Sequence, residues 1–142
     1  MATENILLQV KRLKKYFPIH AGIFSRITGY VHAVDDVSFH LSKGENLGLV
    51  GESGCGKTTT GRLVLGLQKP TSGEVFFDGE NLFNYSKARR RAERRNMQII
   101  FQDPYASLNP SMSVGEIIGE PIQFHGIATG RDKQARVSEL LE

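Results

Sequence analysis

The chain has 142 residues, of which 39% are apolar and 23% charged, and its formal net charge is +3. This length allows one domain of usual size, and the composition excludes a disordered or fibrous protein. No apolar run approaches the ~20 residues of a membrane span and the polar N-terminal sequence is no secretory signal, so we expect a cytosolic protein. The mild positive charge favours anionic partners, among them ATP, lipid headgroups and nucleic acid.

The first part of the chain predicts two strands separated by a loop. Residues 6–13 mix apolar and polar side chains in the manner of an edge or half-buried strand. Pro18 then ends this pattern, because proline cannot donate to a β-ladder. We expect an irregular loop over residues 19–30, then a second strand at residues 34–41 with a kink or bulge at Asp35 and Asp36. A turn at residues 42–45 follows.

The next segment carries the motif around which we expect the rest of the chain to be organised. Residues 51–58 fit the pattern G-x-x-x-x-G-K-[ST] at every specified position. The apolar run before it, residues 46–50, predicts a buried strand, and residues 58–67 after it have helical spacing. A strand, a glycine-rich loop and a helix in this order indicate a nucleotide-phosphate site rather than a turn that binds nothing.

The residue types of this loop suit phosphate chemistry. Gly51, Gly54 and Gly56 let the backbone wrap closely around phosphate oxygens, so that several N–H groups point inward. Lys57 would place a positive charge on the β- and γ-phosphates, the Thr58 hydroxyl would bind Mg²⁺, and the helix N-terminus would add positive potential. At Cys55 we favour a small residue in a crowded turn over a redox role, because no second cysteine or metal-spaced histidine accompanies it.

Beyond the loop the sequence predicts further strands and helices. Residues 69–73 end the helix, residues 74–77 predict a strand and residues 78–79 a tight turn. Residues 86–96 hold six basic residues against one acid, which favours a solvated helix face over a nucleic-acid patch because no aromatic residue is interleaved.

The remaining residues predict one strand and two helices. Residues 97–101 indicate a buried strand with Gln102 at its carboxyl end, the edge at which ligands sit in open α/β sheets. A proline-bounded loop follows at residues 103–110. Capping-box spacing at Ser113 and Glu116, and again at Thr129 and Asp132, predicts two further helices.

Taken together, these residues resemble the nucleotide-binding subunit of ABC transporters, in particular the ATP-binding subunits of oligopeptide and dipeptide importers. The resemblance covers nearly the whole chain and is carried by residues 13–18 (LKKYFP), 32–39 (HAVDDVSF), 51–59 (GESGCGKTT) and 100–110 (IFQDPYASLNP). It implies an α/β fold with a P-loop NTPase core, an antiparallel β subdomain and the start of a helical subdomain. Residues 1–142 would then form the N-terminal part of one ABC ATPase domain.

The resemblance also implies roles for individual residues. ATP and Mg²⁺ would be bound by the loop residues Gly51, Glu52, Ser53, Gly54, Cys55, Gly56, Lys57, Thr58 and Thr59, with Thr59 on a further phosphate oxygen. Gln102 would be the Q-loop glutamine, which reaches Mg²⁺ and the attacking water and shares the catalytic role with Lys57. An aromatic residue stacks on adenine in this family. Phe17 fits by local sequence and Tyr30 by its spacing to Lys57, and core packing is the alternative for either.

The chain departs from the family pattern in one respect. The signature motif, the Walker B strand with its Asp-Glu pair and the switch histidine are not in these 142 residues, and the family places its catalytic carboxylate there. We therefore expect the N-terminal part of a longer ATPase, which by itself binds nucleotide weakly and hydrolyses it poorly. We also expect marginal stability, because the strands of a parallel sheet need paired neighbours and covered faces.

The leading hypothesis is an ATPase that energises an importer of peptides or similar small solutes at the cytoplasmic face of the membrane. Its partners would be two transmembrane permease subunits and a second, identical or different, ATPase, with no specific nucleic acid. Importers of nickel or glutathione carry closely similar ATPases and are alternatives. Three others are a soluble ABC-type ATPase of DNA repair or translation, a basic nucleic-acid module at residues 87–95, and a non-catalytic nucleotide-binding fragment.

Overall fold

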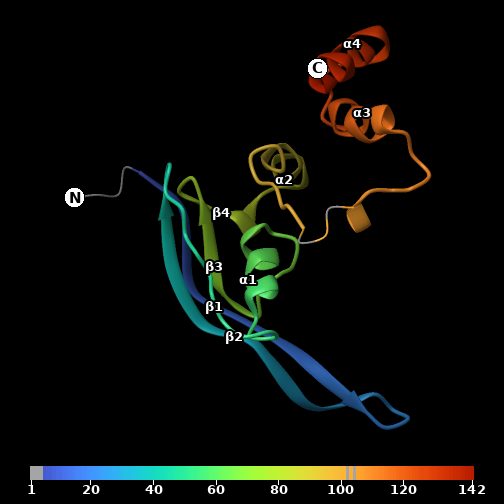
Figure 1. The fold of residues 1–142 in the computed structure, drawn as a ribbon. Coiled ribbons are helices and arrows are strands. Elements are labelled where there is room, and N and C mark those ends of the chain that lie inside the picture. The colour runs from blue at the N-terminus through green and yellow to red at the C-terminus, as the bar shows by residue number, and fades with distance from the viewer. Residues whose placement is uncertain (1–4, 102, 104) are drawn as a thin grey trace. The chain divides into compact units, whose positions relative to one another are not determined.

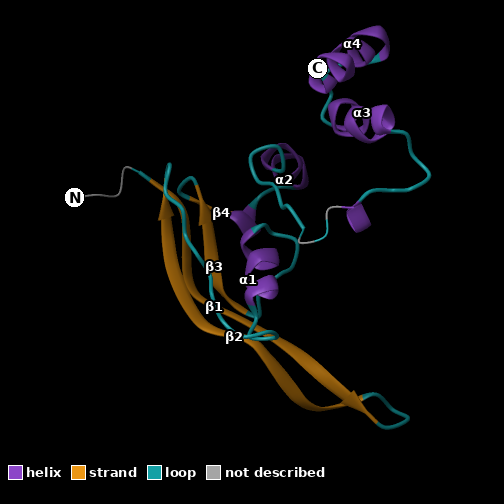
Figure 2. Ribbon diagram, in the orientation of Figure 1, coloured by secondary structure: helices purple, strands orange, loops and turns teal. Residues whose placement is uncertain are grey.

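The computed structural model describes residues 5–101, 103 and 105–142, with only the main chain at Ala106. The chain divides into two compact units, Met1–Arg90 and Arg91–Glu142. An antiparallel sheet and a short helix make up most of the first unit, and helices make up the second (Figures 1 and 2).

The sheet of the first unit has the strand order β2-β1-β3-β4, with antiparallel neighbours throughout. Its strands are β1 Ile6–Ala21, β2 Arg26–Ser42, β3 Ser72–Phe77 and β4 Glu80–Asn81. The strands predicted at residues 6–13, 34–41 and 74–77 are confirmed. The bulge predicted at Asp35 and Asp36 is also confirmed, because the ladder shifts register there and Asp36 has a φ of 55°.

The first two strands are much longer than predicted. The expected break at Pro18 and the expected irregular loop at residues 19–30 are both wrong, since β1 and β2 stay paired as far as Ala21 and Arg26, with Pro18 opposite Tyr30. Beyond Lys14, β1 pairs with β2 alone among the described residues. Pro18 therefore lies on a strand with a free edge, where a missing N–H donor breaks no ladder.

Helix α1, Lys57–Val64, packs against the sheet and closes the core of the first unit. The helix predicted over residues 58–67 is confirmed but ends earlier. A short 3-10 helix, η1 Leu82–Asn84, follows β4. The buried apolar side chains of the first unit come from β1, β2, β3, α1, η1 and the residue after η1: Val10, Leu13, Val34, Leu63, Val75, Leu82 and Tyr85.

The second unit contains the helices α3 Val114–Phe124 and α4 Gly130–Leu141 and the 3-10 turn η2 Tyr105–Ser107, and α2 Lys87–Glu93 crosses the boundary between the units. The capping box at Ser113 is confirmed with both of its bonds. At α4 the helix is confirmed but the Thr129 side chain makes no capping bond; Gly130, with a φ of 56°, turns the chain differently there. Among the described residues, no helix has the length and apolar character required to cross a bilayer.

Two runs predicted as buried strands, residues 46–50 and 97–101, are neither strand nor buried. Val50 and Ile100 are each 91% exposed, and Leu47 and Phe101 about half exposed. A strand exists only where a neighbour accepts and donates its main-chain hydrogen bonds, and no described segment pairs with either run. The apolar composition of these runs shows that they suit burial, but it does not supply the neighbour.

Candidate phosphate-binding site

The predicted phosphate-binding loop occupies residues 51–56 and leads directly into α1. Gly54 and Gly56 have φ values of 84° and 95°, a left-handed conformation that favours glycine. The first hydrogen bond of the helix runs from the Thr60 N–H to the Gly56 carbonyl at 2.8 Å. The N–H groups of residues 57–59 therefore precede the helix's own bonding, and such groups are what a helix N-terminus offers to an anion.

The Lys57 side chain folds back over this loop. Its Nζ donates to the carbonyl oxygens of Gly51 at 2.7 Å and Glu52 at 2.5 Å, and lies 3.5 Å from the Cys55 sulfur. The structure thus brings the predicted residues Gly51, Glu52, Cys55 and Lys57 together. Phosphate oxygens are stronger acceptors than neutral carbonyls, so the ammonium is placed to exchange these partners for a phosphate.

Strand β2 supports the loop at Gly56. A Cβ atom at this position would lie 2.0 Å from the Ala33 carbonyl oxygen and 3.7 Å from the Val34 Cγ2 atom, whereas one at Gly54 would meet nothing within 4 Å. Both glycines have positive φ, but only Gly56 also abuts a neighbouring strand. Sequence reasoning missed Ala33 as part of the site, because no local pattern marks a main-chain oxygen on a distant strand.

The two aromatic candidates, Phe17 and Tyr30, lie on opposite faces of the paired β1 and β2 strands. Neighbouring residues alternate between faces, and residues opposite each other in the ladder share one. Phe17 has the Lys15 ammonium 5.0 Å from its ring centre, and Lys15 is opposite Val34, the side chain beside Gly56. Tyr30 is opposite Pro18, which immediately follows Phe17 and so belongs to the other face.

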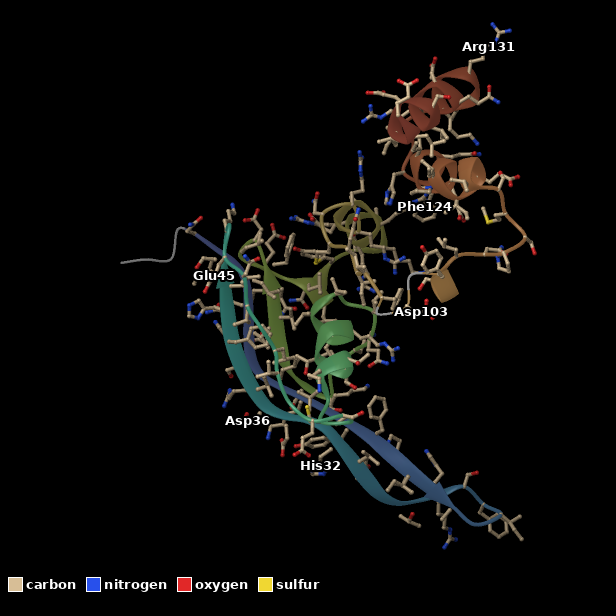
Figure 3. All side chains as sticks on the ribbon, in the orientation of Figure 1. His32, Asp36, Glu45, Asp103, Phe124 and Arg131 are labelled. Carbon is tan, nitrogen blue, oxygen red and sulfur yellow. The ribbon has the colours of Figure 1, made fainter. Side chains whose placement is uncertain are left out.

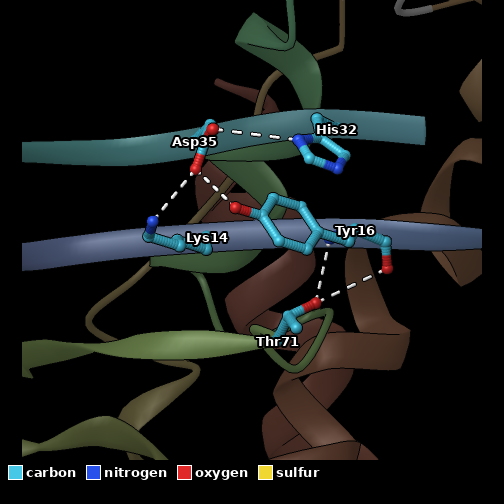
Figure 4. Close-up of polar contacts among 5 residues, drawn as sticks. All are labelled: Lys14, Tyr16, His32, Asp35 and Thr71. Atoms are coloured by element: carbon cyan, nitrogen blue, oxygen red, sulfur yellow. Dashed lines mark hydrogen bonds and ion pairs between the residues drawn. The ribbon is translucent and has the colours of Figure 1, made fainter. Parts of the chain in front are cut away.

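A polar cluster, which sequence reasoning also missed, involves β1, β2 and Thr71 (Figure 4). The Tyr16 hydroxyl donates to the Asp35 carboxylate at 2.5 Å, and Lys14 lies 3.2 Å from the same oxygen. The His32 ring stacks on the Tyr16 ring with 4.0 Å between the ring centres, and the His32 Nδ1 atom is 3.8 Å from the Asp35 carboxylate. His32 and Asp36 both lie on β2 (Figure 3). The Thr71 hydroxyl accepts a hydrogen bond from the Tyr16 N–H and donates one to the Tyr16 carbonyl oxygen.

The cluster shifts the pKa values of its members. The hydrogen bond from Tyr16, followed by that from Lys14, lowers the pKa of the Asp35 carboxyl. The same bonds to Asp35 raise the pKa of the Tyr16 hydroxyl and of the Lys14 ammonium. The cluster therefore favours ionised Asp35 together with protonated Tyr16 and Lys14.

Three basic residues of α2 bond to protein groups. In the first unit, Arg89 pairs with Glu80 at 2.9 Å and lies over the Tyr85 ring, and Arg90 donates to the Tyr85 carbonyl. In the second unit, Arg91 donates to the Phe124 carbonyl at 2.6 Å and lies over its ring. Three of the predicted basic residues thus make structural contacts.

Gln102, which the sequence predicts as a catalytic residue together with Lys57, lies outside the described residues.

Two curated proteins illustrate the sequence similarity. The chain is 49% identical over 141 residues to the oligopeptide transport ATP-binding protein AppF of Bacillus subtilis strain 168, covering 99% of this chain and 43% of that protein. It is 48% identical over 136 residues to the glutathione import ATP-binding protein GsiA of Escherichia coli strain K12, covering 96% of this chain and 22% of that protein. The chain therefore spans less than half the length of either relative.

Solved structures show the same fold. The dimeric, post-hydrolysis ATP-binding cassette MJ0796 bound to ADP and Pi matches with a TM-score of 0.72 at 24% identity, over 94% of this chain and 55% of that one. The cbiO1 component of the cbiONQ ABC transporter complex of Clostridium perfringens matches with a TM-score of 0.66 at 25% identity, over 94% and 47% of the two chains. The sequence profile of ABC transporters matches residues 34–142. With that match over most of its length, the chain belongs to the ABC transporter family.

Proposed function

We propose that this chain is the ATP-binding part of a subunit that energises an ABC importer of oligopeptides or dipeptides. The observation that carries the proposal is the phosphate loop, in which left-handed glycines, the folded-back Lys57 ammonium and the N-terminus of α1 converge. The sequence identity to an oligopeptide transport ATP-binding protein supports the choice of solute. The glutathione import relative, at nearly the same identity, keeps glutathione as the alternative solute. Nickel, the other alternative from the sequence, has no support among these relatives.

The residues of the loop fit ATP with Mg²⁺. The Lys57 ammonium would hold the β- and γ-phosphates, and the N–H groups from Gly54 to Thr59 would bind phosphate oxygens. The exposed hydroxyl of Thr58, in the first turn of α1, would be a Mg²⁺ ligand. Bound Mg²⁺ neutralises charge on the transferring phosphate, and Gln102 would orient the attacking water beside it.

We infer that Phe17 rather than Tyr30 stacks on the adenine ring. Phe17 is on the face of the β1–β2 pair that Lys15 and Val34 share beside the phosphate loop, and it is 37% exposed, which leaves ring surface for a base. Tyr30 is on the other face. An exposed aromatic ring on the loop's side is the arrangement that base stacking requires.

Full activity would require more chain than these 142 residues. The catalytic carboxylate, the second nucleotide-binding half-site and the permease subunits are proposed to come from the rest of the protein and its partners. The helices α3 and α4 would be the part of the chain that meets the permease. The subunit would then work at the cytoplasmic face of the membrane as one of a pair of ATPases.

The proposal is tested by titrating the chain with a fluorescent ATP analogue in the presence of Mg²⁺. Lys57→Ala should weaken binding by more than about tenfold, because it removes charge-assisted bonds to phosphate. Lys69→Ala is the matched control, since it removes the same charge from an exposed site after α1. Equal affinity of Lys57→Ala and the unaltered chain would refute the proposed site, as would equal losses in both variants.

A further inference from the structure

The outer part of the β1–β2 pair is a two-stranded ribbon, residues 15–34, that continues past the end of β3 pairing (Figure 1). Its strands are joined by a turn at residues 22–25, in which the Ser25 N–H donates to the Gly22 carbonyl at 3.1 Å. From residue 17 to residue 32 no side chain is buried. A two-stranded hairpin without a packed face is marginally stable in water, so this ribbon gains from a surface that covers it.

The tip of the ribbon is strongly apolar. Ile23 is 99% exposed and Phe24 84% exposed. Four more large apolar side chains along the ribbon are each about half exposed: Ile19, Ile27, Tyr30 and Val31. Single exposed apolar residues are common on protein surfaces, but Ile23 and Phe24 are adjacent and almost fully exposed at the tip of a hairpin, and such a patch marks a contact site. Here the pairing of β1 with β2 extends to Ala21 and Arg26, with one register shift after Ile19, so the exposure does not come from unpaired strands.

The charge of the ribbon is of one sign. There is no Asp or Glu from residue 16 to residue 34, whereas Lys15 and Arg26 lie within the ribbon; at its base, Lys14 is paired with Asp35 at 3.2 Å. A second copy of this ribbon would bring like charges together. An anionic lipid surface instead offers phosphates to the cations and acyl chains to the apolar tip.

We propose that the ribbon tip inserts into the interfacial region of a bilayer that contains anionic lipid. Ile23 and Phe24 enter the boundary between headgroups and acyl chains, and Arg26 binds lipid phosphate at the level of the headgroups. The choice of a membrane rests on the proposed function, which places the chain at a membrane surface. The contact would be additional to docking on permease subunits and would orient the ATPase against the lipid beside them.

The chain has no tryptophan, so a single introduced indole reports on one position. Phe24→Trp should show a blue-shifted emission with phosphatidylcholine vesicles that contain phosphatidylglycerol, and a smaller shift with phosphatidylcholine alone. Tyr105→Trp is the matched control, because Tyr105 is an aromatic residue of similar exposure, 86%, in the second unit. A shift at position 105 with none at position 24 would refute the proposal and assign lipid binding to another surface.

A second pair of variants separates the two kinds of contact. In vesicle sedimentation, the double variant Ile23→Ser with Phe24→Ser should lose at least about tenfold in affinity, and Arg26→Gln roughly fivefold, the latter only with anionic lipid. Both should keep the nucleotide affinity of the unaltered chain, which shows that they are folded and keeps this test separate from that of Lys57. Unchanged sedimentation of the double variant would overturn the proposal, as would tip-dependent capture of a purified protein partner without lipid.

Discussion

Asp35 shows how individual side chains stabilise the base of the ribbon. Its carboxylate accepts a hydrogen bond from the Tyr16 hydroxyl and pairs with the Lys14 ammonium. These contacts lower the pKa of the Asp35 carboxyl. A carboxyl with a lowered pKa in the folded state adds stability above its unfolded pKa, and loses it as pH falls through the folded value. Tyr16 and Lys14, whose pKa values are raised, add stability that is lost as pH rises through their folded values.

Removing the Tyr16 hydroxyl tests which of these contacts dominates. In Tyr16→Phe the pKa of the Asp35 carboxyl should rise towards its ordinary value, because the phenol hydrogen bond is the main cause of its low pKa. An NMR titration of the Asp35 side-chain carboxyl measures this pKa directly. Tyr30→Phe is the control: it removes a different tyrosine hydroxyl of the same ribbon and should leave the pKa of the Asp35 carboxyl unchanged. Identical titration curves for Tyr16→Phe and the unaltered chain would assign the low pKa to Lys14 instead.

At the scale of elements, the pairing of β1 with β2 decides which aromatic ring faces the nucleotide. Local sequence favoured Phe17 as the adenine-stacking residue, and the spacing to Lys57 favoured Tyr30. Neither pattern contains the β1–β2 register, which puts Phe17 opposite Val31 and Tyr30 opposite Pro18. Adjacent positions along a strand point to opposite faces, so the two rings cannot both lie beside the loop.

The register yields a paired prediction for nucleotide binding. Phe17→Ala should weaken the affinity for ATP roughly tenfold, because base–aromatic stacking is worth about 1–3 kcal/mol, whereas Tyr30→Ala should change it little. Comparison of the affinities for ATP and for inorganic triphosphate measures the contribution of the nucleoside, which Phe17→Ala should reduce. A greater loss in Tyr30→Ala than in Phe17→Ala would show that the opposite face of the ribbon meets the base.

Elements with local signals were predictable, and those that depend on a distant neighbour were not. The glycine loop with α1, the capping box of Ser113 and the turn at Asp78 and Gly79 each follow from a few adjacent residues. The outer ribbon was missed because Pro18 and two glycines read locally as a loop, although β2 supplies a ladder. Conversely, residues 46–50 and 97–101 have the composition of strands but lack a described pairing neighbour.

At the scale of the whole molecule, these two runs leave apolar surface exposed in each unit. Val50 in the first unit and Ile100 in the second are each 91% exposed. Such residues add nothing to a folded core, yet they are available to other apolar surfaces, including other copies of the chain. We therefore expect self-association of the chain at high concentration.

Substitution of the exposed residues should separate association from stability. Val50→Ser with Ile100→Ser should lower light scattering and dye binding to apolar surface, while changing the free energy of unfolding by no more than about 0.5 kcal/mol. Leu63→Ala is the contrasting variant, because Leu63 is 0% exposed and its truncation should cost about 2–5 kcal/mol in urea unfolding. Undiminished scattering of the double variant would place the associating surface elsewhere.

The contact between Gly56 and the Ala33 carbonyl has a consequence for reading conservation in relatives. Any side chain at position 56 would overlap that carbonyl, 2.0 Å from the added Cβ, whether or not a nucleotide ever binds. Natural selection for folding alone would therefore retain glycine at position 56. At position 54, with open space around it, Asn and Asp are residues that tolerate the same backbone angle. Invariance at 54 is thus better evidence for a ligand than invariance at 56, even though both belong to one motif.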